Sequence, residues 1–390
     1  MERRHFIRLL GGGIVSAATA GTVSGCSSEL PASALAAWQG PGPAPAPGTD
    51  PRRWLLSHAI LAPHSHNLQS WLVDLREPDT ITLYCDRSRL LPETDPFSRQ
   101  MMMSQGTFLE LLDLAARQLG LRADMHLFPQ GEFGPTEIDS RPTAIVRLQA
   151  DARVRPDPLF QQVFRRRTNR EAYETREPAP EALAEVAASA LAPDLTVGFV
   201  GGAQAALRDR HREVAMQAWR IELETPRTLL ESYRYLRIGP EEIAQHRDGI
   251  SLNKPFVRVV TALGLFDRTQ APAAGDRNIA TQIQEFNAKL AGTPAFFWMT
   301  TQGNSRSTQV LAGRAYARAQ LAATAHGLSM HPLQQALQEY PEQARPYAAI
   351  HQLVDAPVAT HTVQMWARLG YAPPVGPAPR RGVEAHLVKA

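Results

Sequence analysis

The chain has 390 residues, of which 44% are hydrophobic and 20% charged, and its formal net charge is +3. These values are typical of a globular protein with a sizeable core, long enough for two or three average domains or one large one. Because no long basic stripe interleaved with aromatic residues is present, the sequence gives little support to nucleic-acid binding.

Residues 1–26 have the pattern of an export signal. Arg3 and Arg4 form a twin-arginine pair, and the apolar stretch that follows is too short and too glycine-rich to span a membrane. Residues 23–26 resemble the box at which bacterial lipoproteins are cleaved and lipidated; an ordinary cleaved signal without lipid is the alternative. We expect export by the twin-arginine route to a periplasmic location or to a membrane-anchored lipoprotein state, with Cys26 as the lipid anchor.

Residues 27–50 are rich in proline and alanine, which predicts a semi-extended linker without a core of its own. Folding proper is expected to begin near Asp50. The second cysteine, Cys85, is expected to be a buried small hydrophobe. Two cysteines exclude a disulfide framework.

The folded part divides into a first half, residues 51–160, and a second half, residues 161–390. In the first half, hydrophobic periodicity predicts helices at 51–61 and 97–119 and strands at 71–75, 80–85, 125–128 and 144–148. In the second half it predicts helices at 181–190, 204–224, 282–291 and 310–327 and strands at 195–200, 294–301 and 363–369. The hydrophobic periodicity is weaker at 225–270. We expect this stretch to be an excursion of the chain that covers another part of the molecule. The fold class is α+β.

Residues 62–71 form a turn that is dense in hydrogen-bonding groups. Pro63 ends the preceding helix, and two imidazoles, hydroxyls and the amides of Asn67 and Gln69 follow. Such a turn could hold a planar polar heterocycle, or its polar groups could simply satisfy the backbone at a helix end. His58, His64 and His66 lack a carboxylate or cysteine at ligand spacing, so we expect no metal site.

Two stretches of the chain echo each other. Residues 106–120 and 313–327 both contain Leu-Ala-Ala at the same offset, and both begin and end with glycine. Arg99 and Arg306 each stand seven residues before the first glycine. If the repeat is real, the chain consists of two copies of one α+β unit, and its sites lie between the copies.

The turn at 63–71 and the arginine run at 166–170 together resemble motifs of the flavin-binding nitroreductase family. The resemblance covers roughly residues 51–390 and points to the long single-chain branch of mycobacterial dormancy-associated, Acg-type proteins. It implies a fused pseudo-dimer of two related α/β sandwich halves. The first half keeps the polar turn and the second half keeps the arginine run, which implies one complete flavin mononucleotide (FMN) site.

The resemblance assigns residues to that site. Arginines, a threonine and a basic C-terminal pair are expected at the phosphate, namely Arg166, Arg167, Thr168, Arg170, Arg380 and Arg381. Polar turn residues are expected at the ring and ribityl chain, namely Pro63, His64, Ser65, Asn67 and Gln69. The backbone of a third segment is expected at the ring edge, namely His331, Pro332 and Leu333.

Two positions depart from the family pattern, and one insertion matches the long branch. Ordinary members have serine at the position of His64 and proline at that of Ser70, so we expect the imidazole to narrow the pocket or to contact the ring. Residues 231–252 resemble a lid that folds over the flavin.

The resemblance implies an oxidoreductase that passes electrons from a reduced nicotinamide through FMN to a nitro or quinone-like acceptor. An exported enzyme would need another donor, such as a membrane quinol or a partner protein. The alternatives are a protein that sequesters FMN with little turnover, and a fold that has lost flavin. Because one fused chain holds both halves, a monomer is expected.

Overall fold

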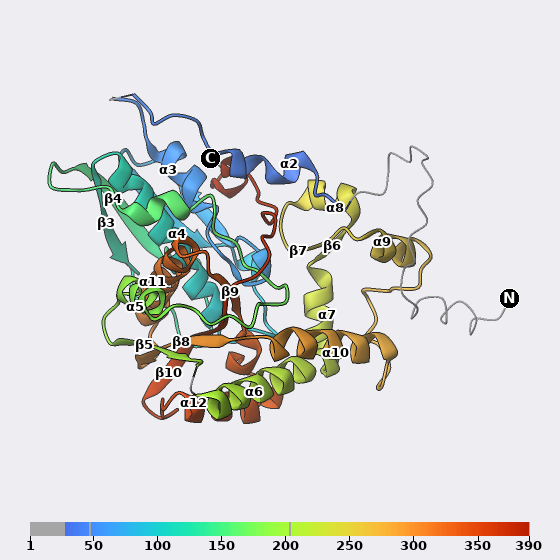
Figure 1. Cartoon of the computed structure of the whole chain (residues 1–390). Coiled ribbons are helices and arrows are strands. Elements are labelled where there is room, and N and C mark those ends of the chain that lie inside the picture. The colour runs from blue at the N-terminus through green and yellow to red at the C-terminus, as the bar shows by residue number, and fades with distance from the viewer. Residues whose placement is uncertain (1–27, 47, 203, 390) are drawn as a thin grey trace.

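The computed structural model describes residues 28–46, 48–202 and 204–389 (Figure 1). The expected signal peptide and Cys26 lie outside these residues. Among the described residues, no helix is long and apolar enough to cross a membrane, and no three side chains of the metal-binding types form a group that could hold an ion.

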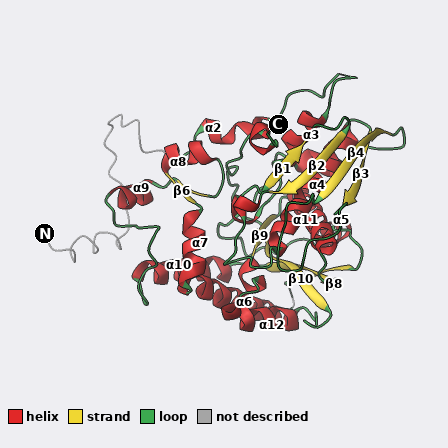
Figure 2. Cartoon of the chain, turned by 180° about the vertical axis from the view of Figure 1, so that it is seen from behind, coloured by secondary structure: helices red, strands yellow, loops and turns green. Residues whose placement is uncertain are grey.

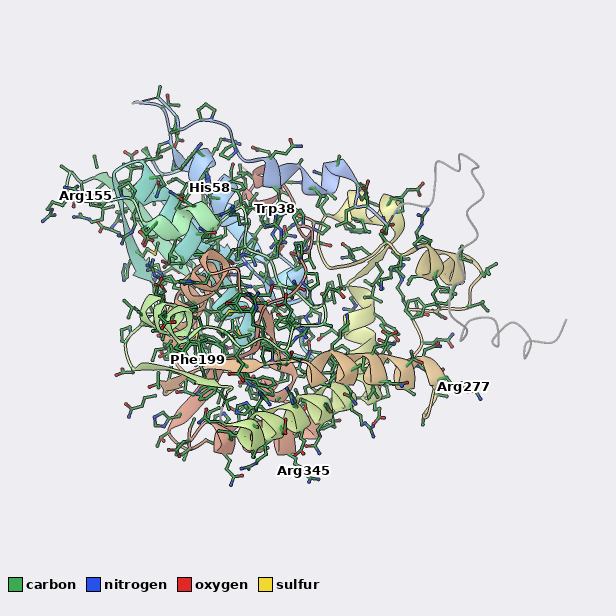
Figure 3. The ribbon with its side chains drawn as sticks, viewed as in Figure 1. Trp38, His58, Arg155, Phe199, Arg277 and Arg345 are labelled. Carbon is green, nitrogen blue, oxygen red and sulfur yellow. The ribbon has the colours of Figure 1, made fainter. Side chains whose placement is uncertain are left out.

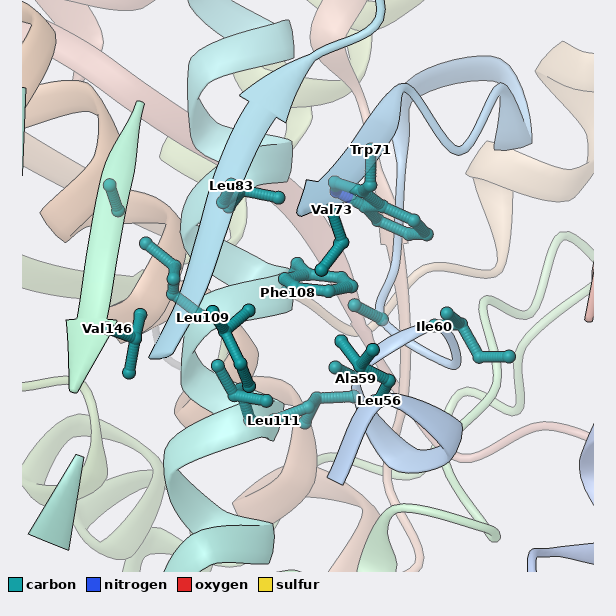
Figure 4. Packing of buried hydrophobic residues seen from close by; sticks show 14 of the residues in the cluster. Leu56, Ala59, Ile60, Trp71, Val73, Leu83, Phe108, Leu109, Leu111 and Val146 are labelled. Atoms are coloured by element: carbon teal, nitrogen blue, oxygen red, sulfur yellow. The ribbon is translucent and has the colours of Figure 1, made fainter. Parts of the chain in front are cut away.

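The first half builds one antiparallel sheet. Its elements are α3 (Arg52–Ala59), β1 (Trp71–Asp74), β2 (Thr80–Cys85), α4 (Arg99–Gln118), β3 (Leu121–Leu127) and β4 (Ala144–Ala150). The strands are ordered β1-β2-β4-β3. Trp71, Leu83 and Val146 point from this sheet onto Phe108 and its neighbours on α4, because alternate strand residues face the same side (Figure 4).

The second half repeats this strand order. Its elements outside the insertion are α5 (Pro180–Ser189), β5 (Leu195–Val200), α6 (Ala205–Glu224), α10 (Arg277–Ala291), β8 (Ala295–Gln302), α11 (Arg306–Ala325), β9 (Ser329–Pro332), α12 (Ala344–Leu353) and β10 (His361–Gly370). The sheet order is β5-β8-β10-β9, so each sheet places the strand before its long helix second and the strand after it at the edge. Both sheets are antiparallel.

Helices α4 and α11 pack against each other between the two sheets (Figures 1 and 2). A Cβ on Gly106 would lie 1.9 Å from the carbonyl oxygen of Val310, and one on Gly313 would lie 1.9 Å from that of Met103. Val310 stands three residues before Gly313, and Met103 stands three before Gly106, so the contact is reciprocal. The glycines of the sequence echo are therefore the points where the two helix backbones touch.

The two echoed arginines are also reciprocal. Arg99 and Arg306 begin α4 and α11, and both side chains are fully buried. The Arg99 guanidinium donates to the carbonyl of Gln364 (2.7 Å) in the second half, and that of Arg306 donates to the carbonyl of Phe97 (2.7 Å) in the first. Each half thus satisfies backbone carbonyls of the other.

The loosened stretch at 225–270 is an insertion with a small core of its own. It contains α7 (Pro226–Arg234), β6 (Leu236–Ile238), α8 (Gly239–His246), β7 (Ile250–Leu252) and α9 (Pro255–Ala262), with β6 and β7 parallel. Leu229 and Tyr233 of α7 pack with Ile279 and Ile283 of α10. The insertion projects to one side of the two sheets (Figure 1).

Every helix and strand expected from the sequence is present, with ends that differ by five residues at most. The expectation of a coreless linker is wrong for residues 32–39, which form α2 (Ala32–Leu35) and a 3₁₀ turn. Ala34 is fully buried and its carbonyl accepts from the Arg380 N–H (3.0 Å). The segment is held by this bond to the C-terminal arm and by packing of α2 against α8.

Candidate functional site

The polar turn is held in a constrained backbone by α4. His66, Asn67 and Gln69 all have left-handed φ values, of 48°, 55° and 55°, a conformation that non-glycine residues adopt at a cost. Such positions cluster at functional sites. From α4, Ser104 Oγ accepts from the Ser65 N–H (3.3 Å), and the Thr107 hydroxyl donates to the Pro63 carbonyl (2.7 Å).

The His64 side chain closes the turn on itself. Its Nδ1 lies 2.8 Å from the Ser65 carbonyl, and its Nε2 accepts from the Ser70 backbone N–H (3.0 Å). This pairing fixes a neutral imidazole with the proton on Nδ1. Desolvation lowers the pKa of His64 to about 3, which agrees with a neutral ring. The ring also packs edge-on against Trp71, with centroids 5.1 Å apart.

Three guanidinium groups gather behind the turn. Arg166 Nη2 donates to the Leu61 carbonyl (3.1 Å), and Arg380 Nη2 donates to the Ala62 carbonyl (3.0 Å), so two distant segments meet just before Pro63. The Arg380 pKa falls well below its usual value because of burial and the charges of Arg166 and Arg167. Within the described parts of the chain, none of the three arginines pairs with a carboxylate. We call Arg166, Arg167 and Arg380 the arginine cluster.

A buried tyrosine and the exposed Arg170 extend the arginine cluster. The Tyr316 hydroxyl of α11 is buried, has no hydrogen-bond partner among the described residues, and interacts electrostatically with Arg166 and Arg170. Burial lowers the pKa of His66 to about 4, with the Arg170 charge adding to the effect. Burial and the charges of Arg368 and Arg170 lower the pKa of His331 well below its ordinary value. Arg170 therefore stands between the turn of the first half and β9 of the second.

The insertion is fastened to the turn. Gln69 Nε2 donates to the Arg247 carbonyl (2.9 Å), and the Gly249 N–H donates to the Asn67 carbonyl (3.2 Å). The carboxylate of Asp248, which is almost fully buried, pairs with Arg89 and with Arg237. The insertion thus covers the polar turn from one side.

No protein-family model matches the chain. Two proteins of Mycobacterium tuberculosis, each named "Putative NAD(P)H nitroreductase" (Rv3131 in strain H37Rv and MT3217 in strain CDC 1551), are 27% identical to it over 359 residues, which span 89% of this chain and 94% of each relative. The predicted resemblance to nitroreductases is confirmed.

Solved nitroreductase structures also match, at lower similarity. The FMN-dependent nitroreductase NfnB from Mycobacterium smegmatis in complex with NADPH is 18% identical, with a TM-score of 0.36 over 60% of this chain and 98% of that one. The FMN- and NADPH-dependent NfnB from Sphingopyxis sp. strain HMH is 16% identical, with a TM-score of 0.38 over 60% and 99%.

The residues that the nitroreductase resemblance assigned to the phosphate do not all meet. Arg166, Arg167 and Arg380 lie together, and Thr168 forms a bridge with Met330 beside them. Arg381 points elsewhere: its backbone N–H donates to Gln69 Oε1 (2.9 Å), and its guanidinium donates to the Gln69 carbonyl. Consecutive side chains on an extended arm point to opposite sides, which separates Arg381 from Arg380.

The amides of the nitroreductase-like turn are engaged by protein groups. Asn67 Nδ2 donates to the carbonyls of Gly249 (3.2 Å) and Pro379 (3.1 Å), and its Oδ1 accepts from Arg380. Gln69 is fully buried and bonded at both ends of its amide. In this structure the two amides hold the insertion and the C-terminal arm.

On the opposite side lie β9 and the residue after it, Leu333. The Leu333 N–H donates to the Trp366 carbonyl (2.8 Å) and its side chain is buried, so this amide is not open to a ligand. His331 Nδ1 accepts from Arg368 Nε (3.0 Å), which leaves the proton of the neutral ring on Nε2. His331 and Pro332 remain half-buried.

Sequence reasoning missed Trp38 and Tyr316. The Trp38 indole covers the Arg167 guanidinium (4.3 Å to the ring centroid), and its Nε1 donates to the Ala378 carbonyl (2.7 Å); the residue lies against the body of the molecule (Figure 3). A tryptophan within a proline-rich stretch was the available signal. No sequence signal pointed to Tyr316, because an aromatic residue on an alanine-rich helix is expected to be a core residue.

Proposed function

We propose that the chain is an FMN-dependent oxidoreductase of nitroreductase type, with a single flavin held between its two fused halves. The observation that carries the proposal is the arginine cluster: Arg166 and Arg380 are buried and Arg167 is half-buried beside the polar turn, and none has a carboxylate partner among the described residues. Buried charge normally requires a counter-charge. Similarity to nitroreductases over 89% of the chain supports a flavin phosphate as that counter-charge.

The described residues fit the phosphate end of FMN. Arg166 Nε, Arg380 Nε and the Tyr316 hydroxyl are buried donors without a hydrogen-bond partner in the part of the chain that the structure describes. Guanidinium groups bind a phosphate dianion through paired N–H donors, and a hydroxyl adds a further bond. Arg166, Arg167, Arg380 and Tyr316 would therefore hold the phosphate, with Arg170 at the edge of the same site.

The groups that would orient the ring lie on both halves. His331 can donate from Nε2, because Arg368 occupies Nδ1. The Ser65 hydroxyl of the turn donates to Gln100 Oε1 (3.2 Å), so it would act toward the ring as an acceptor. Bound FMN would supply the two-electron redox chemistry. The chain's own contribution is to fix the ring by these two groups and to exclude water with the insertion.

The resemblance to nitroreductases suggests the electron acceptor, and the proposed location bears on the electron donor. A nitro or quinone-like compound is the proposed acceptor, and a reduced nicotinamide or a membrane quinol is the proposed donor. Export through the twin-arginine route favours the quinol, since reduced nicotinamides are not expected outside the cytoplasm. The chain would act as a monomer because α4 and α11 already bring the two halves together.

One observation favours sequestration of FMN with little turnover as a second candidate. Both amides of the turn are tied to the insertion or the arm, and Glu231 of α7 accepts from the Thr94 N–H (2.8 Å) and hydroxyl (2.6 Å). A covering fixed at this many points would open slowly and limit access to the ring.

The first experiment is an absorption spectrum of the purified protein, followed by anaerobic addition of NADPH and, separately, of a reduced quinol analogue. A flavin spectrum that bleaches with either donor supports the oxidoreductase and identifies the donor. A spectrum that persists with both supports sequestration. A protein without flavin, even after incubation with FMN, would refute both.

A matched pair of variants tests the phosphate assignment. Arg166→Leu removes a buried guanidinium, and we expect FMN binding to weaken by about 10- to 100-fold, as for loss of a charged hydrogen bond. Arg165→Leu, one residue earlier and exposed, should leave binding unchanged. Equal FMN affinity in the two variants, at comparable thermal stability, would contradict the assignment.

A further inference from the structure

Helix α9 exposes an apolar face. Phe256 and Val259 are each 55% exposed, and Leu263 and Leu265 just beyond the helix are 60% and 53% exposed. No residue of α9 is buried. Because 256, 259 and 263 are spaced by three and four residues, their side chains lie on one face of the helix. We call Phe256, Val259, Leu263 and Leu265 the α9 patch.

The first described residues lie close to this patch. Asn253, two residues before α9, donates from Nδ2 to the carbonyl of Glu29 (2.5 Å). Cys26, the proposed lipid anchor, stands three residues before Glu29, so it is at most about 11 Å of extended chain away. Helix α9 lies at the outer edge of the insertion, away from both sheets (Figure 1). An acyl chain on Cys26 would therefore enter a bilayer close to the α9 patch.

The charges around the patch match a phospholipid surface. Lys254, just before α9, is exposed, and residues 254–265 contain no acidic residue; Arg258 is half-buried, and its side chain lies beside Gly239 of the insertion. An amphipathic helix with apolar residues on one face and basic residues beside them binds in the interface of anionic membranes.

A second copy of this chain fits the patch less well. Stable protein interfaces involve about 20–30 residues a side. Four side chains on a helix of eight residues and the turn after it do not approach that size, whereas a helix of this length can lie in a headgroup layer.

We propose that the α9 patch docks onto an anionic phospholipid bilayer beside the Cys26 anchor. The proposal rests on the proposed export and anchoring, which give the patch a membrane to meet. Docking would hold the insertion that covers the polar turn against the bilayer, where a quinol donor dissolves.

The test labels single cysteines with an environment-sensitive dye in the full chain carrying Cys26→Ser, which removes the lipid site; Cys85 is buried and does not label. Labels are placed by Phe256→Cys and Leu263→Cys, and by Leu191→Cys and Val358→Cys as controls, since these two residues are 73% and 55% exposed elsewhere. Phosphatidylglycerol vesicles should blue-shift and brighten the α9 labels roughly threefold or more, as expected when an apolar face enters the lipid interface. The control labels should not change.

Three outcomes would overturn the proposal. The first is no change at either α9 label; the second is an equal change at all four labels. The third is that the emission of the α9 labels is already blue-shifted before vesicles are added. The patch would then be covered by residues 1–27 or, if the shift depends on protein concentration, by a second copy. The flavin spectrum of the same samples reports separately on the proposed function.

A second pair of variants confirms the energetics. Phe256→Asp combined with Leu263→Asp should lower the vesicle partition coefficient by about tenfold or more, since two large apolar side chains no longer enter the interface. Leu191→Asp should leave it unchanged. Partition that is the same in both variants would contradict the docking surface.

Discussion

Replacing Ser70 with proline would remove both groups that contact His64 Nε2, the backbone N–H (3.0 Å) and the hydroxyl (2.7 Å), and a double-mutant cycle can measure their joint contribution. Alone, His64→Ala leaves the Ser70 N–H buried without a partner, which costs about 1–3 kcal/mol. It also removes the edge-on contact with Trp71, which is worth about 0.5–1.5 kcal/mol. When Ser70→Pro is already present, the first cost disappears because no N–H remains. We therefore expect a coupling free energy of about 1–3 kcal/mol between the two substitutions.

The assay is guanidinium denaturation of the four proteins, followed by tryptophan fluorescence, with Trp71 next to the substituted site. His66→Ala combined with Ser70→Pro is the control, because the His66 ring bonds to Ser65 and Ser232 and not to Ser70. Its effects should add to within about 0.5 kcal/mol. Additivity of the His64 and Ser70 substitutions to the same precision would refute the reasoning. It would mean that the two departures from the family pattern are independent.

Three further predictions concern the helix contact, the N-terminal segment and pH. Gly106→Ala should destabilise the protein by about 3 kcal/mol or more, because its Cβ would meet a backbone oxygen at 1.9 Å, whereas Gly376→Ala, with open space around it, should shift the melting temperature little. Trp38→Ala should weaken FMN binding by about 2- to 30-fold through loss of the ring over Arg167, and Trp38→Phe should recover most of it in a fluorescence titration. The pKa of His64 is lowered to about 3 in the folded state from an ordinary value of 6.5. Neutral His64 therefore contributes fully to stability above pH 6.5, and this contribution is lost as the pH falls toward 3, because the unfolded chain binds the proton first. His64→Ala should reduce the slope of stability against pH between pH 6.5 and 4 by up to about 1.4 kcal/mol per pH unit.

Elements with a strong local period were predictable from the chain itself. The strands at 80–85 and 195–200 were predicted with the bounds that the structure gives them, because alternation of β-branched and apolar residues is a property of adjacent residues. The echo of two glycines and two arginines was also visible. That this echo marks a reciprocal contact of α4 and α11 could be seen only in the tertiary structure.

The candidate site was predictable in its ingredients and not in its arrangement. The sequence selected the polar turn, the arginine run and the basic pair near the C-terminus. It could not show that Arg380 joins the arginine cluster while Arg381 hydrogen-bonds to Gln69. Neighbouring side chains on an extended arm point to opposite sides, and the residues on which the arm packs decide which side chain faces inward. The expectation that the His64 imidazole narrows a pocket or contacts the ring stays a prediction; the structure shows that both nitrogens of this imidazole bond within the turn.

The sequence by itself determined the α+β class, the long helices, most strands and the chemistry of the turn and arginine run, since each depends on local period or residue type. Only the tertiary structure decided what those groups face. The Trp38 ring covers the Arg167 guanidinium although 129 positions separate the two residues. Tyr316 of α11 interacts electrostatically with Arg166. Such contacts between distant residues depend on burial and loop closure over the whole chain, and no local pattern encodes them.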